Sequence, residues 1–322
     1  MIMEHRSKLY LPLTKEQLDA IVKTVFGVEK YTAHLIEGGL FNTTYELNVL
    51  FTRHILRVGP INRHLLVPYE HHLMAAENFA YTQMKHAGIP CSDVICCDTT
   101  KQLIDRDFMI VSAAEGEMLS KLDLTEQEKE QAYEKVGLMI SKLHQIKEPM
   151  FGRLADVLQG KGTYTWFEAL WSAYIDWKSV AIKTPYFTAA EYEAVEYELK
   201  RDKQILNAVK EPYLTHCDLW ENNVLAKRDG KDIVITALID IDRAFCGDPE
   251  FEFGYEFMLT DAFKKGYGCL DDAADAIRRR LIYRMLCCFN DAYVWYVEYE
   301  NVEMGDANKK AAMEALAALT DI

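Results

Sequence analysis

The chain has 322 residues, of which 50% are apolar, and it carries a formal net charge of −14 at pH 7. This length and apolar content suffice for a large buried core and for two lobes or domains. The negative charge disfavours nucleic acid as a partner. The sequence has neither an apolar run of about 18 residues nor an apolar amino-terminal segment of the secretory type, so we expect no membrane partner.

The negative charge is concentrated in the second part of the chain. Residues 1–111 contain 11 Lys and Arg and 12 Asp and Glu, so the other 25 basic and 38 acidic side chains, a balance of −13, follow Val111. This balance would attract a cationic substrate, although it is also what solvated helix surfaces produce. The eight cysteines fit neither a disulfide framework nor CxxC metal spacing, so we expect reduced thiols and a cytoplasmic protein.

The first predicted elements are a helix and a pair of strands. Lys15 to Val25 has apolar residues on one helical face, and Thr14 with Gln17 forms a capping box before it. Alternating apolar residues then predict a strand from Phe41 to Phe51 and a second from His54 to Val58. The glycines that precede them are typical of a hairpin turn, and such a turn can also let backbone amides approach phosphates.

A longer helix and another strand follow. The helix is predicted from about Tyr69 to His86, where Gly88 and Pro90 stop it. Leu103 to Val111 has the composition of a strand.

The second part of the chain is predicted to be mainly helical. Thr125 with Glu128 and Thr188 with Glu191 are capping boxes that begin helices. Further helices are predicted from Trp166 to Lys183 and from Arg278 to Glu300. Aromatic residues at helical spacing, such as those of the Trp166 helix, are typical of a core.

A cluster of polar residues between Tyr213 and Glu252 indicates phosphoryl transfer. His216, Asp218 and Asn223 form the pattern H-x-D-x-x-x-x-N, and Asp240 ends an apolar run. Transfer from ATP needs a carboxylate that orients the acceptor hydroxyl and oxygen ligands for magnesium. Asp218 suits the first role, and Asn223 with Asp240 suits the second.

A predicted hairpin brings these residues together. If Asp229 and Gly230 form a two-residue loop, paired positions sum to 459, so Asn223 lies opposite Thr236 and Asp240 falls beside Leu219. The predicted base and the predicted metal ligands then converge at one end of the hairpin.

This combination resembles the aminoglycoside phosphotransferase and choline kinase-like branch of the protein-kinase fold. In that family a similar H-G-D-L-x-x-x-N pattern precedes I-D-x-x-x and G-D-P-x-x-D, and here Gly247, Asp248 and Pro249 supply the last of these. Cys217 stands where the family usually has glycine. Glu252 stands where it usually has aspartate, which keeps the carboxylate.

The resemblance implies a nucleotide site in the first part of the chain. The segment before the first strands takes the place of the nucleotide-covering loop, and its candidate phosphate contacts are Gly38, Gly39, Asn42, Thr43 and Thr44. Arg57 takes the place of the strand lysine of protein kinases, and Glu77 would form a bidentate pair with it. Ser112 through its carbonyl and Ala114 through its amide would contact adenine.

The resemblance also implies the architecture and the reaction. We expect an α+β protein of two lobes, with a nucleotide-binding lobe at 1–111, a hinge at 112–116 and a mainly helical catalytic and acceptor-binding lobe at 117–322. The implied activity is an ATP- and Mg²⁺-dependent phosphotransfer to a hydroxyl of a small molecule in a monomer or homodimer. The favoured acceptor is aminoglycoside-like or otherwise cationic.

Alternatives remain at this point. Choline, ethanolamine or a sugar could be the acceptor, and a non-catalytic kinase-like nucleotide-binding protein is a reading of another class. The Trp166 helix could also line an acceptor pocket in place of a core, and its candidate residues are Trp166, Trp171, Tyr174, Glu168 and Asp176.

Overall fold

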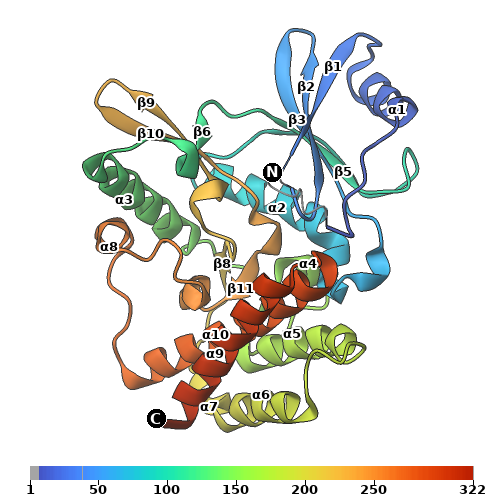
Figure 1. Ribbon diagram of the computed structural model, residues 1–322. Coiled ribbons are helices and arrows are strands. Elements are labelled where there is room, and N and C mark those ends of the chain that lie inside the picture. Colours follow the sequence, from blue (N-terminus) through green and yellow to red (C-terminus); the bar gives the residue numbers. More distant parts are fainter. Residues whose placement is uncertain (1–6, 38, 322) are drawn as a thin grey trace.

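The computed structural model describes residues 7–37 and 39–321 and shows a sheet lobe above a helical lobe (Figure 1). The sheet lobe is one antiparallel sheet of five strands in the order β1-β2-β3-β5-β4. Its strands are β1 (Tyr31–Ile36), β2 (Thr43–Val49), β3 (Thr52–Val58), β4 (Val94–Asp98) and β5 (Phe108–Ser112). Helix α1 (Lys15–Phe26), with the predicted Thr14 capping box, packs its buried face on this sheet.

Several predictions for the sheet lobe need correction. Strands β1 and β4 are not predicted. Strand β2 ends at Val49 because Leu50 and Phe51 form the turn to β3 with φ values of 52° and 64°. The strand predicted from Leu103 begins only at Phe108, because Lys101 adopts a left-handed φ of 59° and bends follow it.

Helix α2 (Leu73–His86) lies between the sheet and the helical lobe (Figure 1). The predicted start at Tyr69 is wrong, because Pro68–His72 is a separate 3-10 turn. The Glu70 carboxylate accepts a hydrogen bond from the Val67 amide at 2.9 Å and thereby caps this turn. Buried residues of α2 share one core with residues of β5 and of the helical lobe, so α2 connects the two lobes.

The helical lobe confirms most of the predicted helices, including both capping boxes. Its helices are α3 (Glu126–Leu143), α4 (Leu154–Leu158), α5 (Trp166–Ala181), α6 (Ala189–Arg201), α7 (Lys203–Leu206), α8 (Asp261–Tyr267), α9 (Ala274–Tyr293) and α10 (Val302–Asp321). Trp166 and Tyr174 are buried in the core, as the aromatic pattern predicts. Across the residues that the structure describes, no helix is long and apolar enough to cross a membrane.

The end of the chain differs from the prediction. The helix predicted over Arg278–Glu300 is α9 followed by a π-helical turn at Val294–Glu298. Helix α10 is not predicted, because alanines such as Ala312 and Ala315 occupy part of its buried face and leave a weak pattern of large apolar residues. Helices α9 and α10 lie side by side in the lower part of Figure 1.

Two small sheets support residues 213–252, the segment that contains the predicted site residues Asp218, Asn223 and Asp240. One combines β6 (Glu117–Met118) with the hairpin of β9 (Val224–Asp229) and β10 (Asp232–Leu238). The other has the order β7-β11-β8, from β7 (Gly152–Arg153), β11 (Phe245–Gly247) and β8 (Tyr213–Thr215).

The predicted hairpin register is wrong, although the hairpin is present. Asp229 pairs with Asp232, so the loop is Gly230 and Lys231, and Gly230 takes the first loop position with a left-handed φ of 63°. A register shift between Ile235 and Ala237 then adds one residue to β10. Asn223 therefore lies opposite Ile239, whose amide donates to the Asn223 carbonyl at 3.0 Å.

Candidate active site

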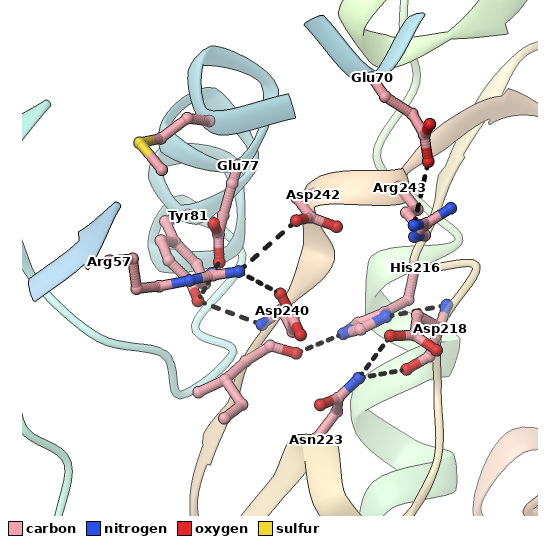
Figure 2. A network of polar contacts seen from close by, with 12 residues as sticks. Arg57, Glu70, Glu77, Tyr81, His216, Asp218, Asn223, Asp240, Asp242 and Arg243 are labelled. Atoms are coloured by element: carbon pink, nitrogen blue, oxygen red, sulfur yellow. Dashed lines mark hydrogen bonds and ion pairs between the residues drawn. The ribbon is translucent and has the colours of Figure 1, made fainter. Parts of the chain in front are cut away.

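His216 links the loop of residues 216–223 to the end of β10 (Figure 2); this loop carries the predicted base and is called the catalytic loop below for that prediction. The Asp218 amide donates to Nδ1 of His216 at 3.3 Å, so Nε2 carries the ring proton and donates to the Ile239 carbonyl at 3.0 Å. Burial lowers the pKa of His216, which keeps the ring neutral and this tautomer in place. His216 thus has a positioning role, and the pairing also brings Asp240 next to the loop.

Asp218 and Asn223 lie together, as the sequence pattern predicts (Figure 2). The Asn223 amide nitrogen donates to the Asp218 carbonyl at 2.8 Å and to Oδ2 of Asp218 at 2.9 Å. The amide oxygen of Asn223 is then the atom of this side chain that can ligate a cation. Burial, followed by repulsion from Asp240, holds the pKa of Asp218 well above its usual range, which favours proton acceptance.

Arg57 joins β3 to α2 and to the end of β10. Its Nη1 donates to Glu77, and its Nη2 donates to Asp240 and lies 3.5 Å from Asp242. The predicted Arg57–Glu77 contact is therefore present, but the pair is not bidentate. The second amino group turns to Asp240 because the segment after β10 packs directly against α2.

Three carboxylates form a group that fits a cation. Ligand oxygens of Glu77, Asp240 and Asp242 all lie within 4.8 Å of one another. Carboxylate oxygens are ligands that Mg²⁺ prefers. Burial, and after it repulsion from Asp240, raise the pKa of Asp242. A positive charge nearby stabilises these three carboxylates, and in this structure Arg57 supplies that charge.

The backbone on each side of this site adopts an uncommon conformation. Cys217 and Asp240 both have a left-handed φ of 63°. Residues other than glycine pay about 1–2 kcal/mol for this region, with aspartate among the more tolerant. The usual glycine at the Cys217 position of the resembled family fits this requirement, and such strain is typical of functional sites.

Glu252 anchors the start of the catalytic loop through the backbone amides of His216 and Cys217. Its carboxylate accepts hydrogen bonds from the amides of His216 at 2.5 Å and Cys217 at 3.1 Å, and it lies 3.5 Å from Nε2 of His144. Burial alone would raise the pKa of Glu252, but the hydrogen bonds that the carboxylate accepts from the His144 ring and from the His216 amide help to outweigh burial, so the pKa is lowered. Glutamate at this position thus keeps the carboxylate contact to the loop.

We predict that Glu252→Gln destabilises the fold by about 1–3 kcal/mol. The two carboxylate oxygens of Glu252 accept from the amides of His216 and Cys217, whereas glutamine has one oxygen acceptor and places an NH₂ donor at the other position. Urea unfolding of the variant measures this change. Glu256→Gln is the matched control, because Glu256 is 67% exposed and pairs only with Arg284 among the described residues. Equal unfolding midpoints for the two variants would show that Glu252 does not hold the loop.

The Gly-Asp-Pro motif supports the site from the core. A Cβ atom at Gly247 would lie 2.1 Å from the Trp166 ring, so only glycine fits there. Asp248 accepts hydrogen bonds from the Tyr283 hydroxyl at 2.7 Å and from Nε of Arg279 at 3.0 Å. These contacts give the motif a structural role.

The predicted phosphate contacts lie at the start of β2. Gly38 is outside the described residues. Thr44 pairs with Arg57, so the two side chains share a face of the sheet. Thr43 is buried, and its hydroxyl exchanges hydrogen bonds with the Leu11 backbone at 3.1 and 3.3 Å. Any phosphate contact by Thr43 therefore falls to its backbone, and Gly39 and Asn42 lie in the turn before it.

Ser112 is the last residue of β5, and Ala114 follows two positions later. The Ser112 amide donates to the Asp93 carbonyl at 2.8 Å, and the Ala114 carbonyl accepts from Arg53 at 3.1 Å. These contacts use the other backbone atoms of each residue, not the Ser112 carbonyl and Ala114 amide predicted to contact adenine.

Residues beyond the predicted set also reach the site. Tyr81 donates to Glu77 at 2.8 Å and accepts from the Asp240 amide at 3.3 Å. Arg243 lies 3.1 Å from Glu70, and its positive charge partly offsets the rise in the pKa of Asp218 that burial and Asp240 cause. Tyr81 stands one helical turn after Glu77, a spacing that could have identified it. Arg243 and Glu70 come together only through the tertiary fold.

Solved structures with this fold include three small-molecule kinases. A thermostable mutant of aminoglycoside phosphotransferase APH(4)-Ia, in a ternary complex with AMP-PNP and hygromycin B, is 18% identical with a TM-score of 0.66, and the match covers 94% of this chain and 98% of that chain. Spectinomycin phosphotransferase APH(9)-Ia, with ADP and spectinomycin, is 14% identical with a TM-score of 0.56 over 97% and 100% of the two chains. A putative fructosamine-3-kinase from Haemophilus somnus 129PT is 14% identical with a TM-score of 0.64 over 93% and 96%.

These identities show the fold alone, and no curated protein sequence matches the chain. The sequence does match a family model, that of the phosphotransferase enzyme family, over residues 32–274. The match includes the catalytic loop, Arg57, Glu77 and the end of β10. The chain therefore belongs to the phosphotransferase enzyme family and is a small-molecule kinase with a protein-kinase-like fold.

Proposed function

We propose that this protein transfers the γ-phosphoryl group of ATP to a hydroxyl of a small, cationic acceptor. The observation that carries the proposal is the arrangement of Asp218, Asn223 and Asp240 at one end of the hairpin, with Arg57 beside them. Residues 1–111 form the nucleotide-binding lobe, 112–116 the hinge, and 117–322 the catalytic and acceptor-binding lobe.

Asp218 accepts the acceptor's hydroxyl proton as the oxygen bonds to the γ-phosphorus and the bond to the β-phosphate oxygen breaks, which releases ADP. Asn223 fixes the carboxylate through the contact at 2.9 Å. The contacts of Arg57 to Glu77 and Asp240 hold its guanidinium beside the site, where its charge would stabilise the phosphates. Catalysis then comes from positioning and electrostatics, with no covalent enzyme intermediate.

Magnesium would bind beside Asp218, at the oxygens of Asn223 and of the carboxylate group that contains Asp240. Asn223 and Asp240 are the proposed ligands, and Asp242 is a further carboxylate within reach of Asp240. A bound Mg²⁺ would neutralise phosphate charge. Adenine would contact the backbone of Ser112 and Ala114, and the phosphates would contact residues 38–44.

The preference for a cationic acceptor rests on the acidic balance of the second part of the chain. Asp176 on α5 is a half-buried acidic residue, and burial followed by repulsion from Asp156 raises its pKa to about 6; we propose it as a contact of the cationic group. Glu168 on the same helix is exposed.

We predict that the acceptor KM rises several-fold as salt increases, because exposed charges are screened beyond about 8 Å near physiological ionic strength. Asp176→Asn should flatten this response, and Glu168→Gln should leave it as in the parent. Steady-state kinetics across a salt series measures both. A flat response in the parent would remove the argument for a cationic acceptor.

The proposal is tested by incubating the protein with Mg²⁺ and ATP against aminoglycosides, macrolides, choline, ethanolamine and sugars. Mass spectrometry identifies any product that gains one phosphoryl group. A phosphorylated product formed only with ATP supports the proposal. ATP binding without turnover on the whole panel would favour a non-catalytic nucleotide-binding protein.

A further inference from the structure

A small cavity in the helical lobe is lined by two polar donors without partners. The cavity has a volume of about 30 Å³, room for about two water molecules, and its walls include Arg153, Tyr174, Trp177, Phe245, Cys287 and Asn290. Nε of Arg153 and Nε1 of Trp177 are both buried, and neither has a hydrogen-bond acceptor among the described residues. Trp177 is only 4% exposed, so bulk solvent does not supply the missing hydrogen-bond acceptor.

Arg153 differs from the arginines around it. Each other arginine after Val111 pairs with a carboxylate, and these are Arg201, Arg228, Arg243, Arg278, Arg279, Arg280 and Arg284. The guanidinium of Arg153 forms no such ion pair among the described residues and instead lies over two rings, with its central carbon 3.9 Å from the Tyr69 centroid and 5.2 Å from the Phe245 centroid. The charges of Asp156, Asp176 and Asp291 act on it from a greater distance. Ring faces attract the charge but supply no acceptor for the N–H group of Nε.

The position of Arg153 relates this cavity to the catalytic loop. Arg153 of β7 and Thr215 of β8 both pair with Phe245 of β11, from its two sides, so the three side chains share one face. Strand spacing puts the two outer Cα atoms roughly 10 Å apart. The Thr215 hydroxyl lies 3.0 Å from Sγ of Cys217, which precedes Asp218. Strands β8 and β11 run side by side above α5 in Figure 1.

We propose that Arg153 and Trp177 bind an anionic oxygen group, a carboxylate or a phosphate, of the acceptor whose hydroxyl is presented to Asp218. This inference rests on the proposed phosphotransfer and narrows its acceptor to a molecule that carries an anion in addition to any cationic group. The cavity has room for about two water-sized atoms, as the two oxygens of a carboxylate or two of the oxygens of a phosphate would supply. A charged oxygen would satisfy both unpartnered donors, and buried donors left without acceptors are costly.

The test uses probes that differ only in the anion: glycerol, glycerate and glycerol 3-phosphate, and ethanolamine with serine. Calorimetry in the presence of Mg²⁺ and ADP measures binding, and ADP release from Mg²⁺ and ATP measures transfer. In the parent, at least one anionic probe should bind about 10- to 100-fold more tightly than its uncharged or decarboxylated counterpart, as expected for a charge-assisted hydrogen bond. The preferred anion distinguishes a carboxylate from a phosphate.

Three variants locate the effect. Arg153→Gln should abolish the preference through KM with kcat retained, Arg153→Lys should keep part of it, and Trp177→Phe should weaken it while keeping the ring. Arg284→Gln is the control, because Arg284 is 37% exposed and pairs with Glu256. Thermal unfolding shows which variants are folded, and Arg153→Lys and Trp177→Phe keep the inference testable if Arg153→Gln does not fold.

The outcomes separate the two proposals. Equal affinity of the parent for charged and uncharged probes, no binding of any anionic probe, or a preference that survives in folded Arg153 and Trp177 variants overturns the anion site. Binding of an anionic probe that depends on Arg153, without any transfer, leaves the anion site and overturns the proposed reaction. Transfer to neutral and anionic probes alike supports the proposed reaction and overturns the anion site.

Discussion

Asp218→Asn is expected to lower kcat by about 10²- to 10⁴-fold, the range that general bases contribute. Asparagine keeps the size of the side chain and a contact to Asn223 but cannot accept the hydroxyl proton. The raised pKa of Asp218, caused first by burial and then by Asp240, is lost with the carboxylate. ATP affinity should stay within a few-fold of the parent, because Asp218 acts on the acceptor.

The matched control is Asp229→Asn, the same substitution on an exposed aspartate at the other end of the same hairpin. Steady-state kinetics and ATP calorimetry are measured for both variants. Near-parental turnover of Asp218→Asn would show that another group accepts the proton.

Asp240→Asn and Asp240→Ala are expected to remove the effect of Mg²⁺ on ATP binding, with a loss of about tenfold or more in affinity when Mg²⁺ is present. The reason is that Asp240 supplies an oxygen to the group formed with Glu77 and Asp242. Asparagine tolerates the left-handed φ of 63° at this position better than alanine, so it separates loss of the carboxylate charge from backbone strain.

ATP calorimetry with Mg²⁺ and with EDTA measures this dependence. Asp232→Ala is the control, because Asp232 lies on the same strand and pairs with Lys135 on the surface. A magnesium dependence that persists in both Asp240 variants would assign Asp240 a structural role at the end of β10.

The pattern of residues 216–240 predicts correctly that these residues lie together, because they are close in sequence. His216, Asp218 and Asn223 need only a short loop, and Asp240 is one hairpin away. The register error of two to three positions did not separate Asp240 from Asn223, because both lie at the open end of the hairpin, where β10 gains its extra residue. Arg57 and Glu77 could be identified only through the family resemblance.

Other parts of the site depend on contacts that no local pattern contains. The Arg57 side chain divides its donors between Glu77 and Asp240 because α2 packs on the segment after β10. The ring environment of Arg153 requires β7, β11 and the Pro68–His72 turn to meet. The sequence presents Arg153 only as one of many charged residues.

The most direct test of the account is a ³¹P NMR time course of the parent protein with ATP, Mg²⁺ and each acceptor that binds. The account predicts loss of the γ-phosphate resonance with matched growth of ADP and of a phosphomonoester, in samples that contain both Mg²⁺ and acceptor, and none of these changes with EDTA or with Asp218→Asn. Persistence of ATP in every sample, or release of inorganic phosphate alone regardless of acceptor, would contradict it.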